Sequence, residues 1–280
     1  MLATLAALTA SLASLAVGAD IPLLAIDGPQ PALISRSGLL ARADARVLGV
    51  AEPLWSARLQ VSVVPLADLL KLDPTPADGG VAAASATLEV SCADGFVAQL
   101  PRAALDNRDP HRPIAYLAVE RPEEPWPLGG HDGKTATGPY AIVWSSPEGQ
   151  RVPDESWAFA VVRLALRTAP AVRYPALAPQ APAGTAPQRG FDVFLQSCLP
   201  CHKLNGQGPA VVGPDLNAPQ SPLDYLGPQR LAAFLRDPQS LRAWEGDPMP
   251  SFSREVLSDG QLADLLSYLA DRQSHRAPTR

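Results

Sequence analysis

Two cysteines and a histidine lie within five residues in the stretch SCLPCHK, residues 197–203. Cysteines spaced as in Cys198-x-x-Cys201 can form a redox dithiol, a disulfide or half of a zinc site. A histidine directly after the second cysteine, here His202, adds a fourth chemistry, the covalent attachment of a c-type haem. In that chemistry the thiols add to two vinyl groups of one haem, and the imidazole binds the iron.

The residues around the motif distinguish these four chemistries. Thioredoxin-like dithiols lie at a strand-to-helix junction, whereas the pattern before Cys198 is helical and a glycine-containing loop follows His202. A structural zinc site needs four ligands, and this half of the chain adds only His275 and acidic residues. A disulfide would leave His202 without a role. Haem attachment uses all three residues.

A sixth iron ligand is needed for electron transfer at a haem that binds no substrate, and methionine often fills this place. The chain has two methionines, Met1 and Met249. Met249 lies between Pro248 and Pro250, where it would be a poor core filler and a good ligand. We therefore predict that His202 and Met249 are the axial ligands of the haem iron.

Helical patterns surround these residues. Residues 190–195 lead into the cysteine pair, and residues 223–236 form a second amphipathic stretch. Ser258 and Gln261 form a capping-box pattern at the start of a third helix. The apolar residues expected to line a dry haem pocket are Phe191, Phe194, Leu216, Leu231, Phe234, Leu235, Trp244, Phe252 and Leu269.

Residues 189–273 resemble a class I cytochrome c, because the first helix, the cysteine motif, the methionine and the last helix follow one another in the order found in that family. The resemblance implies that the terminal helices cross closely at Gly190, with Phe194 and Tyr268 packed at the crossing. It further implies one covalent haem c, held by Cys198 and Cys201, and redox proteins as electron donor and acceptor.

The loop after the haem motif also resembles that family. Gly213-Pro214-Asp215-Leu216 corresponds to a loop whose proline carbonyl accepts a hydrogen bond from the ring of the histidine ligand. By this resemblance, Pro214 should fix the tautomer of His202.

Residues 20–172 have a different pattern, in which short strands dominate. Alternation over residues 87–92 and 96–100, separated by Asp94-Gly95, predicts a β-hairpin. Further strands are expected at 114–120, 140–145 and 157–166, and short helices at 37–43 and 65–72. The fold class predicted is an α+β domain with a mainly antiparallel sheet, followed by an all-α domain.

Residues 45–168 resemble the molybdopterin-binding domain of the sulfite oxidase family, through the segments at 93–101, 114–118, 138–144 and 156–161. Enzymes of that family bind molybdenum through a cysteine thiolate beside an arginine-rich loop. Here Cys92, the only cysteine of the domain, precedes Ala93-Asp94-Gly95 instead. We interpret Cys92 as a core residue and the domain as a docking module without molybdopterin. The alternative is a molybdenum-dependent oxidoreductase with a fused haem relay.

The N-terminal segment is typical of an exported protein. Residues 1–19 have no charged side chain and end in Val17-Gly18-Ala19, as expected of a signal peptide cleaved after Ala19 for export to the periplasm. No later segment is apolar enough to span a membrane.

Proline recurs through residues 173–188, which we interpret as a linker between the two domains. We interpret residues 274–280 as a tail. A net charge of -5 argues against a nucleic-acid partner.

Overall fold

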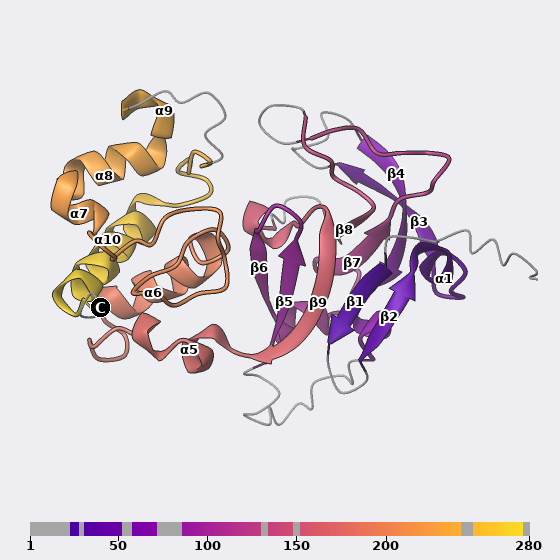
Figure 1. Ribbon diagram of the computed structural model, residues 1–280, viewed down its shortest axis with the longest axis horizontal. Coiled ribbons are helices and arrows are strands. Elements are labelled where there is room, and N and C mark those ends of the chain that lie inside the picture. The colour runs from indigo at the N-terminus through magenta and orange to yellow at the C-terminus, as the bar shows by residue number, and fades with distance from the viewer. Residues whose placement is uncertain are drawn as a thin grey trace, which may run out of the picture.

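The computed structural model describes residues 23–27, 31–51, 58–71, 86–129, 134–147, 152–241 and 249–276. Two sheets form the N-terminal region, and a group of helices forms the C-terminal region beside them (Figure 1). The predicted signal peptide, Trp244 and Pro248 lie outside the described residues.

The larger sheet has the order β2-β1-β9-β5-β6 and the smaller one the order β3-β4-β7-β8. All pairs are antiparallel except β1 with β9, so the sheet predicted as mainly antiparallel includes one parallel pair. The strands are β1 (Leu23–Asp27), β2 (Ala32–Ser35), β3 (Arg46–Ala51), β4 (Arg58–Pro65), β5 (Ala86–Cys92), β6 (Val97–Pro101), β7 (Ile114–Val119), β8 (Tyr140–Ser145) and β9 (Val161–Thr168).

The β5–β6 hairpin confirms the prediction from the alternating pattern. Leu88 pairs with Leu100 and Val90 with Ala98, and all four side chains are buried in the core of the N-terminal region. Gly95 supplies the positive φ of the turn, at 91°. The hairpin places β6 at one edge of the larger sheet.

The short helices of the N-terminal region are α1 (Arg36–Leu40), α2 (Leu66–Leu69) and α4 (Arg102–Leu105), with a 3-10 turn η1 (Asp154–Ser156). The strand predicted at 157–166 begins only at Val161. Ala158 instead forms an isolated bridge with Ile142, and Ala160 has a φ of 47°, which breaks the extended conformation.

The C-terminal region consists of α6 (Ala186–Ser197), α7 (Pro222–Tyr225), α8 (Gly227–Arg236), α9 (Pro238–Leu241) and α10 (Asp259–Ser274). The capping box predicted at Ser258 and Gln261 is present at the start of α10. None of the helices in the described part of the chain is long and apolar enough to cross a membrane.

Helices α6 and α10 cross at Gly190. A Cβ atom there would lie 2.5 Å from the carbonyl carbon of Asp264, so only glycine permits this approach. The ring of Tyr268 packs against those of Phe191 and Phe194, with centroid distances of 5.5 and 5.2 Å. This is the crossing that the class I cytochrome c resemblance predicts.

The segment predicted as a linker packs against both regions. It contains α5 (Pro170–Arg173) in part, η2 (Pro175–Leu177) and the first turn of α6. The Leu177 side chain is fully buried in the core of the helices, and its carbonyl accepts a hydrogen bond of 2.7 Å from the Tyr268 hydroxyl. Leu177 therefore anchors this proline-containing segment to the helical region.

Candidate haem site

The cysteine motif forms a tight turn directly after α6. The N–H of Cys198 caps the helix by donating to the carbonyl of Phe194. The Cys198 carbonyl then accepts from the N–H groups of Cys201 at 3.1 Å and His202 at 2.8 Å. Both thiols of the motif are free. This turn brings the two thiols and the imidazole of the motif together at the end of α6.

Both thiols are held in apolar surroundings. Cys198 is 8% exposed, and Leu199 beside it is fully buried. Burial raises the pKa of Cys198, and burial together with nearby carboxylates raises the pKa of Cys201 to about 12. Reactive dithiols instead have lowered thiol pKa values, so this environment is unfavourable to the redox interpretation.

The His202 ring is oriented by the following loop. Its Nδ1 lies 2.8 Å from the carbonyl oxygen of Pro214. Because a carbonyl can only accept, Nδ1 carries the hydrogen and Nε2 keeps its lone pair for a metal. Burial lowers the pKa of His202, which favours the neutral form that binds metals. This is the contact that the family resemblance predicts for Pro214.

Gly213 forms the surface on which the imidazole lies. A Cβ at this position would be 2.5 Å from Nδ1 of His202, so any side chain would displace the ring. The N–H of Gly213 donates to the Cys201 carbonyl at 2.8 Å, which joins the loop to the motif.

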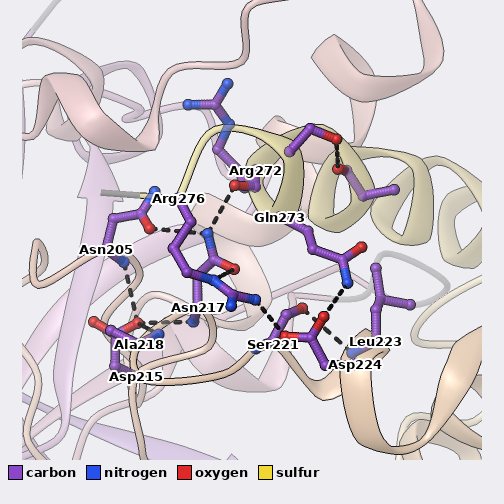
Figure 2. Close-up of polar contacts among 12 residues, drawn as sticks. Asn205, Asp215, Asn217, Ala218, Ser221, Leu223, Asp224, Arg272, Gln273 and Arg276 are labelled. Carbon is purple, nitrogen blue, oxygen red and sulfur yellow. Dashed lines mark hydrogen bonds and ion pairs between the residues drawn. The ribbon is translucent and has the colours of Figure 1, made fainter. Parts of the chain in front are cut away.

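The Asp215 carboxylate holds the loop that presents the Pro214 carbonyl (Figure 2). It accepts hydrogen bonds from four backbone N–H groups, those of Asn205, Gly206, Asn217 and Ala218. Sequence reasoning missed this role, because nothing in a single sequence indicates which of the nearby backbone groups a loop aspartate will bind.

Asn217 connects this loop to α10. Its side chain is 1% exposed, and its amide nitrogen donates to the Arg272 carbonyl at 2.7 Å and to Asn205 Oδ1 at 2.9 Å. Nearby, Asp224 on α7 accepts from Gln273 and Arg276 of the C-terminal segment (Figure 2). The hydrogen bonds from Gln273, from the backbone of Ser221 and from Arg276 lower the pKa of Asp224.

Replacing Asn217 with alanine should lower the free energy of unfolding by about 1–3 kcal/mol, because it removes the hydrogen bonds that the buried amide donates to the Arg272 carbonyl and to Asn205 Oδ1. Urea denaturation followed by circular dichroism measures this change. Gln273→Ala is the control, because its bond to Asp224 is exposed, and it should change the stability by less than about 0.5 kcal/mol. Equal losses in both variants would contradict the role given to Asn217.

Met249 reaches the same core as the cysteine motif. It is half-buried and packs against the cluster that contains Phe194, Cys198 and Leu199. The segment after it is fixed to α8, where the N–H of Phe252 donates to the Leu235 carbonyl at 3.0 Å.

Most of the predicted pocket residues also lie in this core. The buried ones are Phe191, Phe194, Leu231, Leu235, Phe252 and Leu269, and the partly buried ones are Leu216 and Phe234. The donor set of two thiols, one neutral imidazole and one thioether, in apolar surroundings, fits a c-type haem.

The competing metal interpretations find less support. Within the described ranges, no group of three or more His, Cys, Asp and Glu side chains is arranged to hold a metal ion, so the zinc interpretation has no ligand set there. Cys92 is 6% exposed in the core between the sheets, and burial raises the pKa of its thiol. That environment suits a core residue better than a molybdenum thiolate.

Residues 185–269 match the family model described as cytochrome C oxidase, cbb3-type, subunit III. No curated protein and no solved structure matches the chain. The match does not extend to the sheets of the N-terminal region, where the likeness to sulfite oxidases stays a prediction. It supports a cytochrome c domain in the C-terminal region, and with it a haem-based electron carrier that has redox partners.

Proposed function

We propose that this protein is a periplasmic monohaem c-type cytochrome that transfers single electrons between redox proteins. The observation that carries the proposal is the turn of Cys198, Cys201 and His202, with the His202 ring held by the Pro214 carbonyl. The bound haem supplies a reversible one-electron couple.

Each residue of the site has its own role. Cys198 and Cys201 would hold the haem through their thiols, and His202 and Met249 would bind its iron. Pro214 and Gly213 fix the tautomer and the plane of the His202 ring. The surrounding apolar core excludes water and thereby favours the ferrous state.

We propose that the protein is exported, and that one region docks a partner while the other binds the haem. C-type haems are attached outside the cytoplasm, which agrees with an export signal over residues 1–19 and a periplasmic product that does not span the membrane. The domains proposed are residues 20–172 for docking and 189–273 for haem binding, joined through 173–188. The buried, high-pKa thiol of Cys92 is unfavourable to the molybdenum-dependent alternative.

The test is a pair of oxidised and reduced visible spectra of the full chain, produced in a host with haem-attachment machinery, and a molybdenum assay on the same sample. We expect one low-spin haem that resists acid extraction, and no molybdenum. The double variant Cys198→Ala, Cys201→Ala should lose the covalent haem, whereas the control Cys92→Ala should keep it. A parent protein without haem would contradict the proposal, and stoichiometric molybdenum would make the protein an enzyme.

A further inference from the structure

The turn of the β5–β6 hairpin, residues 92–97, touches the haem-attachment motif. The N–H of Val97 donates to the carbonyl of Pro200, the residue before Cys201, at 2.9 Å. β6 is an edge strand, and edge strands present unpaired backbone groups. The carbonyl of the buried Pro200 thus accepts the hydrogen bond that a further strand would accept on this edge. Figure 1 shows β6 on the side of the sheets that faces the helices.

A second contact lies at the tip of this hairpin turn. A Cβ at Gly95 would be 2.8 Å from Cγ2 of Val211, which belongs to the loop after the motif. The tip is shaped by Asp94, whose carboxylate accepts from the Phe96 N–H at 2.9 Å. The hairpin turn therefore contacts both the motif and the loop that supports His202.

The segment between the two regions keeps these contacts in place. Arg173 donates to Glu89 on β5 at 2.6 Å and to Gln99 on β6 at 2.8 Å, and so grips both strands of the hairpin. Three residues later, the N–H of Ala176 donates to the side-chain oxygen of Gln207 at 2.8 Å. The chain is thus fixed to the sheet on one side and to the helical region on the other.

We propose that the hairpin turn is a built-in cap over the attachment edge of the haem, so that redox partners approach a different face. This inference rests on the proposed function and gives the N-terminal region a specific part in it. The cap contacts the Cys198–His202 motif through the edge of β6, at Val97. Through Gly95 it contacts Val211 in the loop after the motif.

The test compares Arg173→Ala with the control Arg163→Ala in the full haem-loaded chain. Arg163 is a β9 arginine whose partner is Asp27, so its loss leaves the hairpin turn untouched. One readout is amide hydrogen exchange of Val97. The other is the rate at which ferricyanide takes one electron from the ferrous haem, giving ferrocyanide and ferric haem. A third variant, Val97→Pro, removes the donor itself, and edge strands tolerate proline where the N–H points away from the sheet.

In the parent, the Val97 amide should be protected. Loss of the charge-assisted bonds of Arg173 should speed its exchange roughly tenfold. Ferricyanide oxidation should be faster in Arg173→Ala and Val97→Pro, and unchanged in Arg163→Ala. An unprotected Val97 amide in the parent, or a folded Val97→Pro variant with the parent's oxidation rate, would overturn the cap. A parent spectrum without haem would overturn the proposed function as well, and Val97 exchange would still report separately whether the hairpin contact forms.

Discussion

Gly190→Ala is expected to destabilise the helical region by about 3 kcal/mol, at the upper end of the usual cost of overpacking. The new Cβ would lie 2.5 Å from the Asp264 carbonyl carbon and 2.8 Å from Cβ of Tyr268. A flexible side chain could move aside, but the backbone of α10 cannot do so without separating the two helices. Urea denaturation of the full chain, followed by circular dichroism, measures the loss.

Gly260→Ala is the matched control for this variant. Gly260 lies in the first turn of α10, and a Cβ there meets nothing within 4 Å. Alanine has the higher helix propensity, so this substitution should stabilise the protein by up to about 1 kcal/mol. If the two variants had the same stability, the close crossing of α6 and α10 would be contradicted.

The effect of Gly190→Ala should extend to the haem site. Phe194, one turn after Gly190, accepts hydrogen bonds from the N–H groups of both Cys198 and Leu199, each at 2.9 Å. A displaced α6 therefore shifts the start of the cysteine motif. We expect a lower yield of protein with attached haem from the same host, together with the loss of stability.

The features that were predictable from the sequence are those set by neighbouring residues. The alternation around Asp94-Gly95 predicted the β5–β6 hairpin, and the spacing of Ser258 and Gln261 predicted the start of α10. The turn from Cys198 to His202 at the end of α6 is likewise formed by neighbouring residues. They need no knowledge of how the chain folds back on itself.

The features that escaped prediction depend on distant partners. Val97 meets Pro200, and Arg173 meets Glu89, across long stretches of chain that carry no signal for the pairing. Proline periodicity predicted a linker over 173–188, and the structure buries Leu177 within that stretch. An apolar side chain in a proline-rich segment is the one local sign that such a segment packs.

Met249→Leu is expected to remove the weak ferric absorption band of methionine–iron ligation and to lower the reduction potential. Leucine keeps nearly the volume of methionine, so its packing against the core of Phe194 and Cys198 should cost less than about 1.5 kcal/mol. It has no sulfur to bind iron. Axial ligands set haem potentials over a range of about 0.8 V, so the shift should be large enough for a spectroelectrochemical titration to resolve.

Two further substitutions separate ligation from packing at Met249. Met249→Ala removes both the sulfur and the bulk, and should give the same spectral change with a greater loss of stability. Met249→His offers another iron-binding group and should restore a low-spin haem, at a lower potential than the parent because the thioether is absent. If Met249→Leu kept the ferric band, Met249 would be a core residue, and the sixth ligand would have to come from another part of the chain.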